Sequence, residues 1–238
     1  MHSNHATTEM APASDQAAVL DGLLRTRFSC RAYRDEPVPR ATIEAALAMA
    51  QSTPSWCNTQ PWQLAIVSGD ALRRLTTDLV AAASGETPPE SSDFPFPAAY
   101  VGDYRERRKV CGVQLYQSLG ITRDDRARAR EQTLENFRCF GAPHLAIVTT
   151  DVELGFYGGV DCGLYLMSFM LALRAHGVDS IAQAALASHP DTLRRHVSLD
   201  PSRRIVCGVS FGIGDLAHPV NSYRTGRAGL DQVVSWSE

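Results

Sequence analysis

Apolar residues recur at helical spacing through the first third of the chain, where one short continuous run interrupts them. Residues 17–24 form a brief helical pattern, and Pro37 and Pro39 open a second helix. The run 64–67 predicts a short buried strand, and Asp70 is placed to cap the helix that follows it. The apolar positions that define the two longer helices are Ile43, Leu47, Ala50, Leu72, Leu75 and Leu79.

The last third contains the longest apolar segment of the chain. Residues 160–175 are apolar almost all round, and Gly177 follows at the C-cap position. A helix of this kind requires burial on every side, either in a core or in a subunit interface. Residues 180–187, which include Gln183, are interpreted as a connection. Three further elements are predicted, namely strands over 144–149 and 205–211 and a short helix over 190–197.

Residues 84–140 are polar and look peripheral. Four prolines make 84–97 a loop, and polar helical patterns follow over 98–119 and 123–138. Aromatic residues recur along the segment, which is either a lid over a site or a set of small satellite cores. The aromatic residues are Phe94, Phe96, Tyr100, Tyr104 and Tyr116.

The order of these elements predicts one domain. Residues 1–14 are polar and are expected to form a disordered arm, followed by a single domain over 15–238. Predicted helices outnumber predicted strands, and the strands lie far apart in the sequence. The fold class expected from this pattern is α+β, with a small central sheet wrapped by helices.

Composition narrows the setting of the protein. Hydrophobic residues make up 44% of the chain and charged residues 21%, which is ordinary globular usage. The net charge of −3 favours neither nucleic acid nor an anionic membrane as a partner. The 160–175 helix contains Asp161 and is too short to span a bilayer, and the N-terminus lacks the apolar core of a secretory signal. Six cysteines without paired spacing indicate reduced thiols, so we expect a soluble, cytoplasmic protein.

Familiar catalytic motifs do not occur in the sequence. It contains no phosphate-binding loop, no dinucleotide-binding glycine motif and no nucleophile elbow. The seven histidines have no metal-ligand spacing, so no metal site is predicted. If the protein is an enzyme, a bound cofactor must carry the chemistry.

Two polar segments stand out against this background. Residues 25–31 place three arginines in seven positions, which either attracts an anion or marks a solvated helix end. Residues 52–62 are made rigid by Pro54 and Pro61 and offer several short polar side chains. This second segment either binds a flat polar ligand or is a connection whose tryptophans fill the core.

Together, these segments resemble the FMN-dependent nitroreductase family. The most specific part is Pro54-Ser55-x-x-Asn58-x-Gln60-Pro61-Trp62, and the resemblance extends from about Arg25 to the C-terminus, with a late arginine pair after a glycine-containing strand. It implies a small, mostly antiparallel sheet in an intertwined homodimer with two FMN sites at the subunit interface. It implies no catalytic side chain, because flavin N5 carries the chemistry.

The resemblance also implies roles for particular residues. Arg27 and Ser29 would hold the FMN phosphate with help from Arg224 and Arg227, because guanidinium groups bind phosphate bidentately. Arg31 would reach the N1–C2 edge of the ring, where relatives often carry Lys. The remaining FMN-binding positions implied are Phe28, then Pro54, Ser55, Trp56 and Asn58 from the other subunit, and Gln183, Ala184 and Ala185 at the ring edge near N5.

The implied activity is reduction of nitroaromatic compounds, and of quinones, by ping-pong transfer of two electrons, with NADPH or NADH as the donor. The segment 84–140 corresponds to the region that covers the flavin, so it is expected to act as a lid. Substrate contacts are expected among Trp56, Phe94, Phe96, Tyr100, Tyr104, Phe137 and Phe140.

Other functions stay open at this stage. The same fold includes reductive dehalogenases, enzymes that fragment the flavin and dehydrogenating enzymes. A dimer that binds flavin without catalysis would carry the same cofactor-binding residues.

Overall fold

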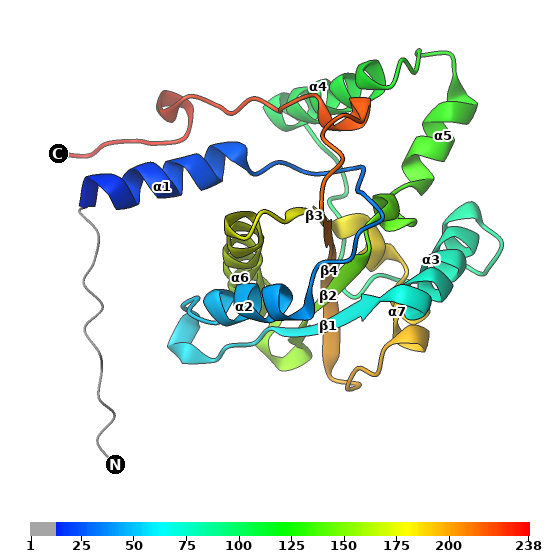
Figure 1. Ribbon diagram of the computed structural model, residues 1–238, viewed down its shortest axis with the longest axis horizontal. Helices are drawn as coiled ribbons and strands as arrows, with labels where there is room; N and C mark the ends of the chain where they lie inside the picture. Colours follow the sequence, from blue (N-terminus) through cyan, green and yellow to red (C-terminus); the bar gives the residue numbers. More distant parts are fainter. Residues whose placement is uncertain (1–12) are drawn as a thin grey trace.

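A four-stranded sheet forms the centre of the computed structural model, which describes residues 13–238 (Figure 1). The strand order is β1-β2-β4-β3, and every neighbouring pair is antiparallel. The predicted fold class is therefore confirmed. The strands are β1 (Gln63–Ser68), β2 (His144–Asp151), β3 (Asp179–Gln183) and β4 (Arg203–Gly212).

Helices cover both faces of this sheet. In Figure 1, α2 and α6 lie on one side of the strands, and α3 and α7 lie on the other. Each face has its own hydrophobic core: Phe169 and Phe211 belong to the first, and Leu79 and Leu145 to the second. The helices are α1 (Ala13–Thr26), α2 (Arg40–Ala50), α3 (Gly69–Ser84), α4 (Gly102–Ser118), α5 (Arg126–Leu134), α6 (Gly155–Ala175) and α7 (Pro190–His196).

Several helix boundaries differ from the predicted ones. Helix α1 begins at Ala13, so residues 13 and 14 belong to it, and the rest of the predicted arm lies outside the described residues. Asp70 does not cap α3, because Ser68 occupies the N-cap position. Instead, Asp70 lies in the first turn and forms an ion pair with Arg73.

Strand β3 is the main correction to the predicted fold. Residues 180–187, with the polar Gln183, were predicted as a connection, and the strand also includes the polar residues Asp179 and Ser180. Its backbone nevertheless pairs with β4 from Asp179 opposite Gly212 to Gln183 opposite Gly208. All three polar side chains are buried, so tertiary pairing determines this strand.

Helix α6 is longer than predicted and is not buried on every side within one chain. It begins at Gly155, and its exposed face includes Phe156 at 77% and Leu164 at 47% exposure. The segment 152–175 is long and apolar enough to cross a membrane by length and composition, which corrects the predicted length. However, 44% of its most apolar window is buried inside the fold, as in the core helix of a globular domain. Gly177 follows α6 with a left-handed φ of 74°, as predicted for a helix end.

The middle segment is tied to the sheet before α4 begins. Glu90 accepts hydrogen bonds from the backbone amides of Asp191 and Thr192 at the start of α7. Asp93 accepts from Arg194 at 2.7 Å and from the Ile205 amide at 2.7 Å. In contrast, α4 has no buried residue in the single chain. The segment is thus anchored at its start and exposed along α4.

Candidate functional site

A cavity of about 570 Å³ lies where the end of α1 meets the C-terminal tail. Its volume is within the range of small-molecule sites. Four of its arginines are the ones predicted to bind FMN: Arg27, Arg31, Arg224 and Arg227. The structure therefore brings together two clusters that are about 200 positions apart in the sequence. The other lining residues are Leu24, Arg25, Phe28, Ser29, Cys111, Met167, Tyr223 and Thr225.

Strand β3 holds the first arginine segment in place. Ser29 forms an isolated parallel bridge with Ser180, and the Cys30 amide donates to the Ser180 carbonyl at 3.3 Å. Tyr33 forms a second bridge with Gly214. Because alternate side chains of an extended segment point to opposite sides, Arg27, Ser29 and Arg31 share one side.

The charge in this cavity is uncompensated. The Arg27 Nε is buried and has no hydrogen-bond partner. Burial lowers the pKa of Arg27, and the positive charge of Arg227 lowers it further. Among residues 13–238, no carboxylate lies within 4.0 Å of Arg27, Arg31, Arg224 or Arg227. An anion such as a phosphate would supply both the missing acceptor and the missing negative charge, so the residues fit an FMN phosphate.

Arg31 lies between two aromatic rings at the far side of this cavity. Its guanidinium carbon is 6.0 Å from the centre of the Phe140 ring and 5.8 Å from that of Tyr223. The Arg31 amide donates to Asn221 Oδ1 at 2.8 Å, which connects it to the tail. Arg224 stacks 3.9 Å above Phe28. Both guanidinium groups thus contact aromatic rings and donate to backbone carbonyls rather than to carboxylates.

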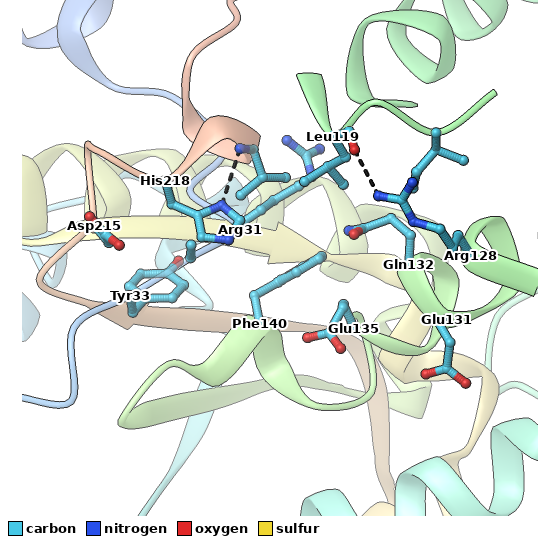
Figure 2. Close-up of a pocket in the computed structure, with 13 residues that line it drawn as sticks. Arg31, Tyr33, Leu119, Arg128, Glu131, Gln132, Glu135, Phe140, Asp215 and His218 are labelled. Atoms are coloured by element: carbon cyan, nitrogen blue, oxygen red, sulfur yellow. Dashed lines mark hydrogen bonds between the residues drawn. The ribbon is translucent and has the colours of Figure 1, made fainter. Parts of the chain in front are cut away.

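A second cavity of about 400 Å³ adjoins the first one at Arg31 (Figure 2). Figure 2 shows Arg31 and Phe140 side by side at its centre, with Glu131 of α5 and Glu135 just after this helix along one side. Arg128 is turned away to donate to the Leu119 carbonyl at 2.9 Å. Helix α5 therefore borders this second cavity, and Cys111 of α4 borders the first.

The loop 52–62 lies elsewhere in the single chain. Figure 1 places it beyond α2, at the opposite side of the molecule from the end of α1. Pro54, Trp56 and Asn58 are exposed, and Ser55 is half-buried. One chain therefore does not bring the two predicted halves of the FMN site together, which agrees with their assignment to different subunits.

The loop has an unusual backbone. Cys57, Asn58 and Gln60 have left-handed φ values of 51°, 56° and 47°. Ser55 Oγ accepts a hydrogen bond from the Gln60 amide at 2.9 Å, and Trp56 packs 4.4 Å from Tyr157, ring centre to ring centre. Left-handed non-glycine residues cluster at functional sites, where surrounding contacts hold them.

The residues predicted to line the edge of the flavin ring differ in how far they are exposed. The side chain of Gln183 is buried, donates to the Asn136 carbonyl at 2.8 Å and accepts a hydrogen bond from Ser210. The side chain of Gln183 is therefore hydrogen-bonded inside the protein, and its predicted role at the ring edge stays a prediction. Ala184 is exposed and Ala185 is half-buried, so their predicted role stays open.

The predicted substrate aromatics fall into two groups. Phe140 lines the second cavity beside Arg31. Phe137 is 8% exposed and belongs to the core under α3, where its ring packs against His189, and it lines neither cavity. Phe94, Phe96, Tyr100 and Tyr104 line neither cavity, and the last three are exposed.

Sequence reasoning missed some residues of the first cavity. Tyr223 and Met167 both line it, yet neither belongs to a polar motif. Only their positions in the sequence could have indicated them, because Tyr223 precedes a predicted FMN-binding arginine and Met167 lies on the long apolar helix. Within residues 13–238, no cluster of three potential metal ligands occurs, and all six cysteines are free thiols.

Comparisons with known proteins give matches over most of the chain. A sequence model described as the Nitroreductase family matches residues 24–213. The chain is 36% identical over 234 residues to Nitroreductase NfnB of Mycolicibacterium smegmatis, covering 97% of this chain and 98% of that protein. It is 32% identical over 219 residues to a 4-nitrobenzoate reductase of a Nocardioides species, covering 91% and 89%. The crystal structure of FMN-dependent NfnB from Mycobacterium smegmatis in complex with NADPH superposes with a TM-score of 0.89 at 36% identity, covering 94% of this chain and 100% of that chain.

Proposed function

This chain belongs to the nitroreductase family, and from that membership we propose that it is an FMN-dependent oxidoreductase that reduces nitroaromatic compounds with NADPH or NADH. The observation that carries the proposal is the uncompensated arginine cavity, in which the buried Arg27 Nε has no acceptor. Relatives named for the reduction of 4-nitrobenzoate and chloronitrobenzene support nitroaromatic substrates. Quinones are proposed as further acceptors.

The proposed roles follow from position and charge. Arg27 and Arg227 bind the FMN phosphate, and Ser29 and Arg224 help to hold it. Arg31, fixed between Phe140 and Tyr223, places a positive charge at the pyrimidine edge of the ring. A fixed cation there stabilises negative charge, and it needs no reorganisation during the reaction. No side chain of the chain is assigned as a catalytic acid or base.

When bound, FMN supplies a ping-pong exchange of two electrons at N5, between the nicotinamide and the nitroaromatic or quinone. The protein's part is to bind and orient these molecules in one pocket. The second cavity, beside Arg31 and Phe140, is the proposed place for the incoming substrate. Helices α4 and α5 within 84–140 are the proposed lid over it, and Trp56 is proposed to reach it from the other subunit.

We propose that the protein works as a homodimer in which the loop 52–62 of one chain completes the FMN site of its partner. Apolar side chains on three elements support this, because each is exposed in the single chain: Val19 of α1 at 64%, Phe156 of α6 at 77% and Trp236 of the tail at 86%. In Figure 1, α1 and the tail extend from the body toward the same side. Light scattering on the purified protein tests this, and a monomer that binds FMN tightly would contradict it.

We propose that the protein is located in the cytoplasm. All six cysteines are free thiols, which suits a reducing compartment, and a net charge of −3 does not favour nucleic acid or an anionic membrane as a partner.

A steady-state assay tests the proposed activity. Purified protein with added FMN should oxidise NADPH or NADH only when a nitroarene such as 4-nitrobenzoate is present, and product analysis should identify reduced nitrogen. The complex of the related NfnB with NADPH supports NADPH as the better donor. Release of halide from a halogenated phenol without reduction of the nitroarene would instead indicate a dehalogenase.

A further inference from the structure

The segment 55–61 is held at both ends by buried charges. At its start, the Trp56 amide donates to the two carboxylate oxygens of Asp161 at 3.2 Å each. At its end, Arg203 Nη2 donates to the Pro61 carbonyl at 2.7 Å. Asp161 belongs to α6 and Arg203 to β4, and both are only 5% exposed.

Neither charge has an ionic partner that would explain its position. Among residues 13–238, neither Asp161 nor Arg203 forms an ion pair within 4.0 Å. The remaining side-chain hydrogen bonds of Arg203 go to the carbonyl of Thr149 at 2.6 Å and to its hydroxyl at 3.1 Å. Asp161 interrupts a helix that is otherwise almost wholly apolar. A buried charge is costly unless it is hydrogen-bonded. The burial of both charges is therefore explained by their hydrogen bonds to the main chain.

The loop between the two charges needs such support. Its residues Cys57, Asn58 and Gln60 are left-handed, a conformation that non-glycine residues keep only when their surroundings fix it. Its internal bonds, such as the one from the Gln60 amide to Ser55 Oγ, set its shape. They do not fix the loop relative to the body, whereas the contacts of Asp161 and Arg203 do.

We propose that Asp161 and Arg203 are positioning residues that clamp the main chain at Trp56 and Pro61, so that Ser55 and Asn58 are presented to the flavin of the partner subunit. Neither residue touches FMN in this arrangement, and both act through the loop. Hydrogen bonds to charged groups are stronger than neutral ones, which suits a clamp that must hold a strained segment. The inference rests on the proposed function, because that function gives the loop an FMN to hold.

Three variants test the clamp. Asp161→Ala and Arg203→Met each remove one end, whereas Asp161→Asn keeps an oxygen that accepts from the Trp56 amide. We expect FMN affinity, measured by fluorescence titration, to fall by about 10- to 100-fold in the first two, the range found for residues that orient binding groups. We expect Asp161→Asn to restore most of it, with a loss below about threefold.

Hydrogen exchange followed by mass spectrometry on the flavin-free protein gives a second readout. Amide exchange in residues 52–62 should accelerate in Asp161→Ala and Arg203→Met, while exchange in the central strands stays at the wild-type rate. Leu79→Ala is the matched control, because Leu79 is fully buried in the core on the other face of the sheet. It should lower the melting temperature and leave both FMN affinity and loop exchange unchanged.

Wild-type FMN affinity in Asp161→Ala would overturn the proposal, whatever its exchange rate. If Arg203→Met does not fold, the FMN affinities of Asp161→Ala and Asp161→Asn test the proposal. Equal FMN affinity in these two variants would also overturn the proposal. A wild-type chain that takes up no FMN contradicts the proposed function instead. The exchange rates of the loop then decide the clamp by themselves, since they require no flavin.

Discussion

Arg27 contributes a guanidinium whose Nε is buried without an acceptor and whose pKa is lowered by burial and by the positive charge of Arg227. Such an arrangement is unfavourable in the protein alone and becomes favourable when an anion binds. Arg27 was predictable from the sequence because arginine and serine at short spacing form a recognisable motif. Its orphaned nitrogen was not, because burial depends on the tail that folds over it.

Replacing Arg27 tests this reading of the cavity. We expect Arg27→Ala to weaken FMN binding by about 10- to 100-fold, since a hydrogen bond to a charged group contributes about 1.5–3 kcal/mol. Fluorescence titration of the flavin measures the change. Arg40→Ala is a suitable control, because Arg40 is exposed and pairs with Glu44 on α2, away from the cavity. A wild-type affinity in Arg27→Ala would contradict the assignment of the phosphate site.

Asn58 allows backbone and side-chain roles to be separated. Its φ of 56° favours glycine over alanine, so Asn58→Gly keeps the loop conformation, whereas Asn58→Ala adds strain of about 1 kcal/mol. If the side chain contacts FMN, both variants should lose FMN affinity while Asn58→Gly keeps wild-type thermal stability. Equal FMN affinity in Asn58→Gly and the wild type would show that the side chain makes no such contact. The left-handed φ itself was not predictable, because no glycine marks the position.

At the scale of elements, the strands that sequence analysis found each contain an uninterrupted apolar run, and the one it missed does not. The runs in β1, β2 and β4 are 64–67, 145–148 and 205–207, whereas β3 has only two consecutive apolar residues and depends on pairing with β4. The missed strand matters for function, because Ser180 in β3 forms the bridge that positions Ser29. The positioning role proposed for Asp161 and Arg203 was missed for a related reason, because a single buried charge carries no periodic signal.

The anchor before α4 is another element that only the fold reveals. Asp93 is largely buried, pairs with Arg194 and accepts from the Ile205 amide. Removing one partner of a buried pair leaves the other uncompensated, so we expect Asp93→Ala to lower the free energy of unfolding by about 3 kcal/mol. Urea denaturation measures this. Asp103→Ala removes an exposed partner of Arg107 on α4 and should change the stability by less than about 1 kcal/mol.

His144 joins β2 to the start of α2 and gives the fold a dependence on pH. The Val38 amide donates to His144 Nε2 at 2.9 Å, so the neutral ring carries its proton on Nδ1, 2.6 Å from Ser68 Oγ. Burial lowers the pKa of His144 below its ordinary value of 6.5. The unfolded chain therefore binds a proton more readily than the folded one in the window below pH 6.5.

It follows that acid should destabilise the protein through this residue. As the pH falls below 6.5, the free energy of unfolding should decrease by at most about 1.4 kcal/mol per pH unit for this one proton. His144→Gln should be less stable at neutral pH but should show a shallower decrease between pH 6.5 and 5. Parallel curves for the two proteins in urea denaturation would contradict this account.

At the scale of the whole molecule, the two parts of the proposed FMN site lie apart in the single chain. The arginine cavity lies at the end of α1, and the loop 52–62 lies on the opposite side of the molecule (Figure 1). Apolar side chains on α1, α6 and the tail are left without cover. Sequence motifs could indicate the arginine segment, the loop and the family. They could not indicate that the two segments lie apart in one chain, because that depends on how the helices wrap the sheet.

The most direct test of the central claim is the absorbance of the purified protein supplied with FMN under anaerobic conditions. We predict that flavin comigrates with the protein, that NADPH or NADH bleaches its visible absorbance, and that a nitroarene then restores it. A colourless protein that retains no FMN, or a bound flavin that the nicotinamide does not bleach, would contradict the account.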